Sequence, residues 1–458
     1  MIRLFFAIFT AKLVGSVTRL FHIGHGSSLP GVVAEKIDPK IAKKLSSKFK
    51  KDIILITGTN GKTTTAKLIS NIIEAAGFSK IHNLTGANLV RGVISSLISH
   101  SNFFGKINSD FGLFEIDEAT LPEAVEKLNP QIIIFNNLFR DQLDRYGEID
   151  KIAKVWKKTL QKIHPATKII LNIDDPSIGF LVQRLNNETT TFGIEDEKYK
   201  IDKLPSFADA IFCPKCGTKF EYKILYLSHL GKYFCPKCGL LRPKPQVIAR
   251  DIELKNTLGI KLKINYGHRE SIVDVNLFGL YNVYNILAAA TCGYALDFSC
   301  EIIKKALCKF TPAFGRFEKT KIEKTPATLL LIKNPTGATE VIHALTFDKK
   351  PKNLFVILND DIPDGRDVSW IWDTEWENLT NFVNFIFISG KRAEDMILRL
   401  KYAQIPQEKM FLIKNPKEAL ILACKKSDER PLFILPNYSA MYSLRNFLAE
   451  EGYLPKII

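Results

Sequence analysis

The sequence predicts an α/β protein with a central parallel sheet covered by helices and a second α/β domain at the C-terminal end. Two observations support this fold class. Short, mainly apolar strands, at residues 53–56, 111–114, 132–135 and 168–172, alternate with segments of helical periodicity, which is typical of a parallel, helix-covered sheet. In addition, 458 residues with 46% hydrophobic and 24% charged content can bury the cores of two or three globular domains.

The charge and the cysteine content narrow the class of protein. The formal net charge of +16 favours contact with an anionic surface, such as nucleic acid, acidic lipid head groups or a polyphosphate. No basic run interleaved with aromatic residues is present, so we expect no nucleic acid partner. Four of the eight cysteines form two C-x-x-C pairs, which indicates metal binding in a reducing, cytoplasmic compartment rather than disulfides. We expect the other four to be core residues: Cys292, Cys300, Cys308 and Cys424.

Residues 1–48 are expected to form an N-terminal helical segment. Residues 1–21 are apolar and aromatic, but three basic residues interrupt them, which argues against a membrane-spanning helix or a secretory signal. The pattern indicates an amphipathic helix that either packs on the protein or makes a peripheral contact with the inner face of a membrane, and packing is favoured. A loop at residues 25–31 and a short basic helix near residues 39–51 should follow.

The central domain, residues 49–312, begins with an apolar strand, the turn T-G-T-N-G-K-T-T at residues 57–64 and a helix over residues 64–76. Glycines in such a turn let backbone N–H groups approach a triphosphate, and the helix start adds its positive dipole end. The lysine would contact the β- and γ-phosphates, and the following hydroxyl would reach Mg²⁺. A plain glycine turn is the alternative. We expect a nucleotide site formed by Gly58, Asn60, Gly61, Lys62, Thr63 and Thr64.

Glu115 directly follows the apolar run at residues 111–114. In open α/β sheets ligands bind at the carboxyl ends of the strands, and a carboxylate placed there can hold the Mg²⁺ that bridges the phosphates. We therefore expect Glu115 and Thr63 to be the Mg²⁺ ligands. An exposed acidic turn is the alternative interpretation.

Two knuckles of the form C-P-K-C-G, at residues 213–217 and 235–239, flank a predicted β-hairpin within an insertion at residues 207–245. Their separation matches a tetrahedral zinc ribbon with four thiolate ligands, and the glycine eases the tight turn around each pair. Four thiolates leave no open coordination position, so the zinc would be structural. Redox chemistry at either pair is the weaker alternative. The expected ligands are Cys213, Cys216, Cys235 and Cys238.

The shortened glycine turn resembles the nucleotide loop of the Mur ligase family, ATP-dependent enzymes that join amines to carboxylates. Residues 136–144 resemble the second signature of that family. Asn137, Asp141 and Asp144 lie on the pattern, but Gln142 replaces a histidine that helps bind a second metal in many relatives. This departure leaves open whether a second metal or a carbamoylated lysine is present. The resemblance implies ATP and Mg²⁺ as cofactors.

Two further segments match the Mur ligase pattern. The run G-L-Y-N-V-Y-N at residues 279–285 resembles the element that approaches the adenine, which implies that Asn285 binds ATP. Asn282 is the expected helix cap. The run F-G-R-F-E resembles the hinge at the start of the C-terminal domain, residues 313–458, and implies that Arg316 reaches the transferring phosphoryl group.

The four-cysteine ribbon, the run D-G-R-D-V-S-W-I-W-D at residues 364–373 and a later L-P-N-Y together resemble the MurT family, the ligase subunits of lipid II isoglutaminyl synthase. The resemblance covers nearly the whole chain. It implies a heterodimer with a GatD-type glutaminase, whose catalytic triad Asp367 would complete, with Asp364 as the alternative. A helix cap is the purely structural interpretation of Asp367.

The same resemblance implies ATP-dependent amidation of the D-glutamate α-carboxylate in the lipid II stem peptide, giving D-isoglutamine. The carboxylate would be phosphorylated, and ammonia from the partner would attack the acyl phosphate. Two alternatives stay open: a stand-alone Mur or folylpolyglutamate-type ligase that adds an amino acid, and a zinc-ribbon scaffold that binds nucleotide as a switch. The sequence does not determine the stem-peptide preference, the ammonia route or the stoichiometry of the complex.

Overall fold

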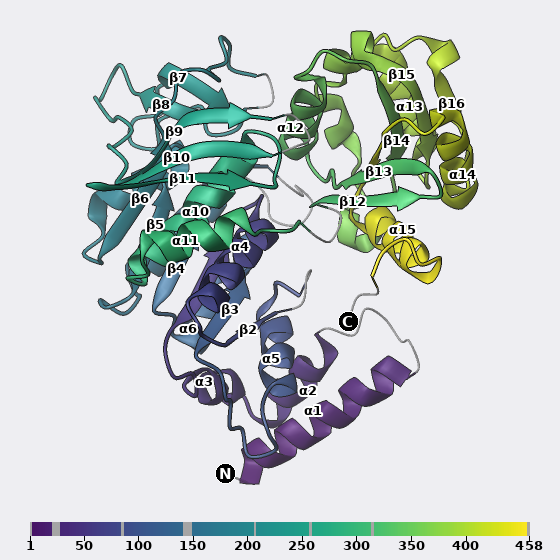
Figure 1. Ribbon diagram of the computed structural model, residues 1–458. Coiled ribbons are helices and arrows are strands. Elements are labelled where there is room, and N and C mark those ends of the chain that lie inside the picture. The colour runs from purple at the N-terminus through teal and green to yellow at the C-terminus, as the bar shows by residue number, and fades with distance from the viewer. Residues whose placement is uncertain are drawn as a thin grey trace.

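The computed structural model describes the chain in seven segments: residues 2–20, 28–83, 87–140, 149–205, 208–255, 259–312 and 316–455. These residues form a nine-stranded sheet, a six-stranded sheet and a two-stranded hairpin, with helices around the two larger sheets. Figure 1 shows the two larger sheets side by side, with the N-terminal helices at one end of the molecule. Within the described segments, no helix is both long and apolar enough to cross a bilayer.

The nine-stranded sheet has the order β11-β10-β9-β6-β5-β4-β1-β3-β2. Its strands run parallel from β2 across to β9, and β10 and β11 add antiparallel at one edge. The central strands β1, β3 and β4 are buried along their whole length, as parallel strands covered on both faces must be. The predicted parallel sheet is thereby confirmed. The strands are β1 Ile53–Thr57, β2 Lys80–His82, β3 Phe111–Glu115, β4 Ile132–Phe135, β5 Lys168–Asn172, β6 Thr189–Ile194, β9 Val247–Leu254, β10 Ile260–Tyr266 and β11 Arg269–Val275.

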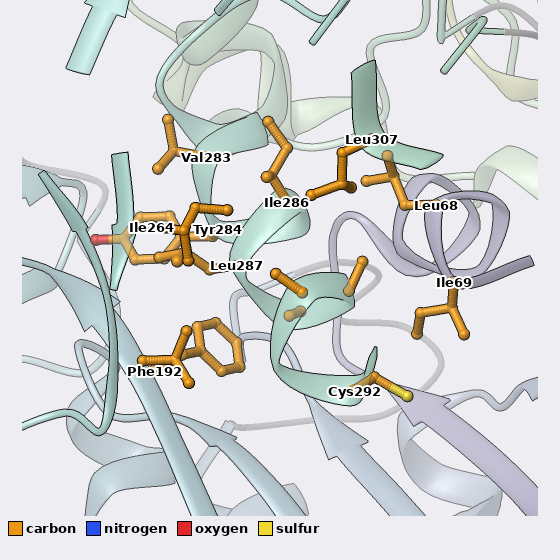
Figure 2. Packing of buried hydrophobic residues seen from close by; sticks show 14 of the residues in the cluster. Leu68, Ile69, Phe192, Ile264, Val283, Tyr284, Ile286, Leu287, Cys292 and Leu307 are labelled. Atoms are coloured by element: carbon orange, nitrogen blue, oxygen red, sulfur yellow. The ribbon is translucent and has the colours of Figure 1, made fainter. Parts of the chain in front are cut away.

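Helices cover both faces of this sheet. On one face, α4 Lys62–Ala75, α10 Tyr281–Ala295 and α11 Cys300–Cys308 enclose one core cluster. Figure 2 shows apolar side chains of α10 in the middle of this cluster. Residues of α4 and α11 lie on one side of them, and the strand residues Phe192 and Ile264 lie on the other. A second core cluster lies on the opposite face. The helices that contribute residues to this second cluster are α1 Ile2–Leu20, α2 Leu29–Ile37, α3 Ile41–Ser46, α5 Val90–Ser99, α6 Leu121–Leu128, α8 Ile149–Leu160 and α9 Pro176–Gly179.

The C-terminal sheet has the order β12-β13-β17-β14-β15-β16, with only the β12–β13 pair antiparallel. Two separate core clusters cover its faces, one with α12 and α13 and the other with α14 and α15. This arrangement confirms the second α/β domain. The elements are β12 Arg316–Ile322, β13 Thr325–Leu330, α12 Pro335–Thr346, β14 Lys352–Ile357, β15 Val383–Ser389, α13 Ala393–Tyr402, β16 Met410–Leu412, α14 Pro416–Ser427, β17 Leu432–Pro436 and α15 Tyr438–Glu450.

The predicted hairpin between the cysteine pairs is also confirmed, as β7 Glu221–Leu227 and β8 Leu230–Phe234. Arg242, just beyond the second pair, anchors this ribbon to the large sheet. Its guanidinium donates to Asp174 at 2.7 Å and to Glu195 at 2.6 Å. Asp174 is fully buried at the end of β5, so the ribbon is fixed to the sheet by a charge pair shielded from water.

Several local predictions are wrong. Residues 29–37 form helix α2, where a loop up to residue 31 was expected, and the following helix is the short α3. Pro30 lies in the first turn of α2, where a missing N–H costs nothing. The backbone of Gly31 packs directly against α5. A Cβ atom at position 31 would overlap the carbonyl oxygen of Arg91 and lie 2.9 Å from its carbonyl carbon, so only glycine fits there. Helix α4 begins at Lys62 rather than at residue 64, so three of the predicted nucleotide residues, Lys62, Thr63 and Thr64, lie in its first turn.

The third correction concerns the cysteines outside the ribbon. Cys292 and Cys424 are buried, as predicted for core residues. Cys300 is only half-buried and Cys308 is exposed. They are the first and last residues of α11. Cys300 packs at the border of the core that Ile303, Ala306 and Leu307 enter, whereas Cys308 is exposed despite its apolar context in the sequence.

Candidate active site

The turn after β1 has the backbone geometry of a phosphate loop. Gly58 and Gly61 have φ angles of +134° and +83°, in the region that favours glycine. A Cβ atom on Gly61 would overlap the side-chain oxygen of Asn285 and lie 2.8 Å from its Cγ. One on Gly58 would lie 2.8 Å from the Asn137 carbonyl oxygen. Both positions therefore require glycine for conformation and for space.

The segment after β4 holds this phosphate loop in place. Asn137 Oδ1 accepts from the Asn60 N–H at 2.8 Å, and Asn137 Nδ2 donates to the Asn60 carbonyl at 3.0 Å. The Thr59 hydroxyl donates to the Phe139 carbonyl and accepts from its N–H, each at 3.0 Å. Asn137 of the second Mur signature thus lies at the loop. The other predicted members of that signature are outside the described residues: Asp141, Gln142 and Asp144.

Lys62 lies in the first turn of α4 with its ammonium group buried beside a carboxylate. Its Nζ is 2.9 Å from Glu118 Oε2 and also donates to the Gly58 carbonyl. Lys333, which follows β13, donates to the Thr59 carbonyl at 3.1 Å. Burial would raise the pKa of Glu118, but the charges of Lys62 and Lys333 outweigh it and hold that pKa below its usual range. The loop is therefore flanked by two cations that share one buried anion.

Neither Glu118 nor Lys333 is predicted from the sequence. Glu118 belongs to the acidic turn after β3, and the sequence favoured Glu115 instead, because Glu115 directly follows the apolar run. Asn334 is a further addition, since its Nδ2 donates to the Asn60 side-chain oxygen at 3.0 Å. The position of Lys333 and Asn334 just beyond β13 is the signal that could have identified them, because ligands gather at the carboxyl ends of parallel strands.

The structure brings Thr63 and Glu115 into contact. Thr63 Oγ1 donates to Glu115 Oε2 at 2.6 Å. His82 lies 3.3 Å from the other carboxylate oxygen, and the Asn83 amide bonds to both the N–H and the carbonyl of Glu115. Hydroxyl and carboxylate oxygens are the ligands that Mg²⁺ prefers, so Thr63 and Glu115 fit a Mg²⁺ site. His82 and Asn83 hold Glu115 in position.

An interdomain cavity of about 630 Å³ lies between the phosphate loop and the C-terminal domain. Its volume is typical of small-ligand sites. The C-terminal domain contributes Lys333, Glu340 and Asp364 to its wall. Glu115 also lines the cavity, and so do all of the predicted nucleotide residues except Gly58. The predicted nucleotide residues that line it are Asn60, Gly61, Lys62, Thr63, Thr64 and Asn285.

Asn285, in α10, lies against the phosphate loop. Its Oδ1 accepts from the Thr65 hydroxyl at 3.3 Å, and its Nδ2 donates to Asn282 Oδ1 at 2.8 Å. Its contact with an adenine stays a prediction. Asn282 is not the helix cap that the sequence suggested, because α10 begins one residue earlier, at Tyr281. The Asn282 side chain instead donates to the Phe278 carbonyl at 2.8 Å.

Arg316 begins β12, and its backbone pairs with Leu330 of β13. Its side chain is outside the described part of the chain, so its role at the phosphoryl group stays a prediction. Glu318, in the same strand, forms a buried two-pronged ion pair with Arg445 of α15, at 3.0 and 3.1 Å. This pair fixes the first strand of the C-terminal sheet to the last helix.

The loop after β14 separates the two candidate triad aspartates. Asp364 is buried, lines the interdomain cavity and accepts from the Ser439 N–H at 2.9 Å, and burial raises its pKa. Asp367 is exposed, and its carboxylate accepts from the Ser369 N–H at 2.8 Å. Hydrogen bonds from Ser369 hold the pKa of Asp367 below its usual range. Asp367 is not the cap of the helical turn that follows, because that position belongs to Val368.

The four cysteine sulfurs of the ribbon lie within 4.8 Å of one another. Cys216 and Cys235 are separated by 3.4 Å between sulfurs, and Cys213 and Cys238 by 3.6 Å. Adjacent sulfurs of a zinc tetrahedron with bonds of about 2.3 Å are roughly 3.8 Å apart. The glycine after each pair has a φ of +73° or +72°, the left-handed turn that wraps the backbone around a metal. The cluster therefore has the donors and the spacing to bind a metal ion.

The ribbon hairpin reaches from this cluster to the active site. Leu227 and Leu230, on either side of its turn, line the interdomain cavity. His229, in the turn, is fully buried, and its ring lies 4.8 Å from the ring of Phe139. Phe139 is bonded to Thr59 of the phosphate loop. The hairpin tip thus contacts the segment that holds the loop, a connection that the sequence does not reveal.

Two families' sequence models match this chain: the Mur ligase middle domain over residues 56–232 and the MurT ligase C-terminal domain over residues 331–441. With the fold and the phosphate loop, they define an ATP-dependent ligase of the Mur class. The chain is 32% identical to the lipid II isoglutaminyl synthase (glutamine-hydrolyzing) subunit MurT of Streptococcus pneumoniae, over 443 residues and 95% of each protein. It is 32% identical to the subunit of the same name from Staphylococcus aureus, over 439 residues and again 95% of each. The chain belongs to the MurT family.

Solved structures of Mur-class ligases share the fold. A pseudomurein peptide ligase type C from Methanothermus fervidus is 24% identical and superimposes with a TM-score of 0.67, over 89% of this chain and 80% of that one. The MurF ligase of Thermotoga maritima, determined in complex with ADP, is 13% identical with a TM-score of 0.65, over 92% and 84% of the two chains. At these identities the likeness establishes the Mur ligase fold alone.

Proposed function

We propose that this chain is the ligase subunit of a glutamine-dependent amidotransferase that converts the D-glutamate α-carboxylate of the lipid II stem peptide to an amide, giving D-isoglutamine. The observation that supports this most strongly is the 32% identity, over 95% of the chain, to proteins named as lipid II isoglutaminyl synthase subunits. The reaction consumes ATP and the ribbon thiols need a reducing medium, so we place the complex in the cytoplasm.

The phosphate loop would activate the carboxylate by phosphorylation. Lys62 and Lys333 bring two positive charges to the loop, where the β- and γ-phosphates of ATP would bind. Thr63 and Glu115 would hold Mg²⁺, which neutralises phosphate charge. Transfer of the γ-phosphoryl group to the carboxylate gives an acyl phosphate and ADP, and ammonia then displaces phosphate to form the amide. Such catalysis is electrostatic, so no nucleophilic side chain of this chain is required.

Ammonia would come from a GatD-type glutaminase bound to this chain as a heterodimer. Asp367 suits the third position of that partner's triad, because its carboxylate is exposed and its lowered pKa keeps it ionised. An ionised carboxylate holds the histidine in the required tautomer and stabilises its cation. Asp364 suits this role less well, since it lines the cavity of the ligase site and burial raises its pKa.

The four-cysteine cluster would hold a structural Zn²⁺ ion. Four thiolates complete a tetrahedral site, so the ion would shape the ribbon and take no part in the reaction. Metal analysis of protein purified without chelators should find about one zinc per chain. Protein that is fully folded with the cluster free of metal would refute this assignment.

The test of the reaction is mass spectrometry of lipid II after incubation with the chain, its co-purified glutaminase, ATP and glutamine. We expect the mass change of one hydroxyl replaced by one amino group. Asp367→Asn should abolish amidation from glutamine and keep it from added ammonium, because the ligase site is untouched. Asp428→Asn is the matched control, an exposed aspartate at the end of α14, and should behave as the wild type.

Three outcomes would redirect the proposal. If Asp364→Asn rather than Asp367→Asn shows the rescue by ammonium, the triad role moves to Asp364. If ATP is hydrolysed while lipid II keeps its mass and a free amino acid is incorporated instead, the chain is a stand-alone ligase. If no ADP forms with partner, glutamine and lipid II all present, the chain binds nucleotide as a switch.

A further inference from the structure

We infer that the outer face of α1 is a binding surface for an anionic lipid bilayer. The inner face of this helix packs on the protein through Leu4, Ala7, Ile8 and Ala11, which are buried against α2 and α5. The opposite face is apolar as well. Apart from the exposed Arg3 and Ser16, the outer face carries large apolar residues, and no other part of the described chain covers them.

Seven large apolar side chains form the exposed surface, which we call the N-terminal ridge. Five of them recur along α1 at intervals of three and four residues, and two stand on the loop after α5. Their exposed fractions are Ile2 76%, Phe6 55%, Phe9 47%, Leu13 56%, Val17 43%, Phe103 45% and Phe104 71%.

The loop residues are continuous with the helix. The ring of Phe5 lies 6.2 Å from that of Phe9, 6.3 Å from that of Phe103 and 5.9 Å from that of Phe104. Fifteen helical steps from Ile2 to Val17 make the ridge about 22 Å long. Figure 1 shows α1 along the outer edge of the molecule, at the end opposite the hairpin of β7 and β8. A contiguous apolar surface of this kind marks an interaction site.

The charge of the N-terminal segment identifies the occupant. The first 50 residues contain nine lysines and arginines but only two acidic residues. Both acidic side chains already lie in ion pairs, with Lys44 at 2.6 Å and with Arg91 at 3.3 Å. Lys12 is at the ridge itself, with its Nζ 5.4 Å from the centre of the Phe103 ring. Aromatic and aliphatic side chains on a segment with an excess of basic residues suit anionic head groups above acyl chains.

The same charge disfavours a second copy of the chain as the occupant. A symmetric dimer through the ridge would bring together two N-terminal segments that each carry nine basic and two acidic residues in the first 50 positions, and such like-charge association is disfavoured. Because α1 does not qualify as a membrane span, it would lie in the plane of the interface with its rings at the depth of the head groups. This inference is independent of the proposed reaction, since the lipid surface alone is the ligand.

The experiment is co-sedimentation of the full chain, together with its glutaminase where the two co-purify, with vesicles that contain no lipid II. One set is phosphatidylcholine alone, and the other adds phosphatidylglycerol. The ridge variant carries Phe6→Glu and Leu13→Glu, and the matched control carries Leu398→Glu and Ile421→Glu, which are 48% and 61% exposed on α13 and α14. Thermal unfolding is followed for each variant.

We expect the wild type and the control to bind the anionic vesicles, and the ridge variant to bind about tenfold more weakly or worse at an unchanged Tm. Binding to anionic vesicles that is equal in all three proteins would overturn the proposal, as would an equal loss in the control. Absence of vesicle binding by the wild type would also overturn it. If the wild type then dimerises and the ridge variant is monomeric, the occupant is a second copy. If the ridge variant instead loses the glutaminase, the occupant is that partner.

Discussion

Replacing Gly61 by alanine should disable the phosphate loop through two separate effects. Alanine at a φ of +83° costs about 1–2 kcal/mol, because the left-handed region disfavours a Cβ atom. The new methyl group would also overlap Asn285, whose side chain would have to leave its hydrogen bonds with Thr65 and Asn282. Each bond contributes about 0.5–1.5 kcal/mol, so the two effects together amount to about 2–5 kcal/mol.

Gly77→Ala is the matched control, because it separates the two effects. Gly77 lies just beyond the other end of α4 with a φ of +84°, and no atom lies within 4 Å of its Cβ position. This variant should lose about 1–2 kcal/mol of stability and keep its affinity for nucleotide. Gly61→Ala should in addition disturb the nucleotide site by about 1–3 kcal/mol, which corresponds to binding about 5- to 150-fold weaker.

The assay is calorimetric titration of each variant with ATP and Mg²⁺, with the Tm measured in parallel. The Asn285→Ala substitution removes the obstructing oxygen. In that background, Gly61→Ala should cost only the free energy of the left-handed backbone conformation, about 1–2 kcal/mol. Nucleotide affinity in Gly61→Ala equal to that of the wild type would refute the steric argument. Equal losses of affinity in Gly61→Ala and Gly77→Ala would refute it too, because they would show a general loss of stability.

Three further predictions follow from the contacts. Stripping metal from the cysteine cluster with a chelator should lower the Tm and weaken nucleotide binding together, because the hairpin tip contacts the segment that holds the loop; an unchanged nucleotide affinity would contradict this. Arg445→Met should cost about 3–5 kcal/mol in urea denaturation, since it removes the two-pronged partner of the buried Glu318, and the double variant with Glu318→Gln should regain part of the loss. Burial alone would lower the pKa of His343, but its contacts with two glutamates raise it from 6.5 to about 10. That stabilisation is complete below pH 6.5 and is lost as the pH rises through about 10, so the stability difference between wild type and His343→Gln should shrink over this interval, and a constant difference would count against it.

Several features of the fold are predictable from the sequence because they are local. Apolar runs and helical periodicity identify the parallel strands and the helix after the phosphate loop. The two C-x-x-C knuckles mark the ends of the hairpin that lies between the cysteine pairs. Where the local signal misleads, packing is the reason. Pro30 and Gly31 suggest a loop, yet they lie in α2, where the glycine admits the backbone of α5.

The sequence by itself determined which chemical groups this protein has: a glycine turn with a lysine and a hydroxyl, four thiolates, and acidic residues after buried strands. Only the tertiary structure decided which of them meet. Lys62 and Glu118 are 56 positions apart and Lys333 and Thr59 are 274 apart, yet each pair lies within hydrogen-bonding distance. Packing likewise placed Asp364 in the interdomain cavity and Asp367 at the surface, three residues away. Electrostatic contacts act over a few ångströms, and those distances depend on how strands and helices far apart in the chain pack against one another.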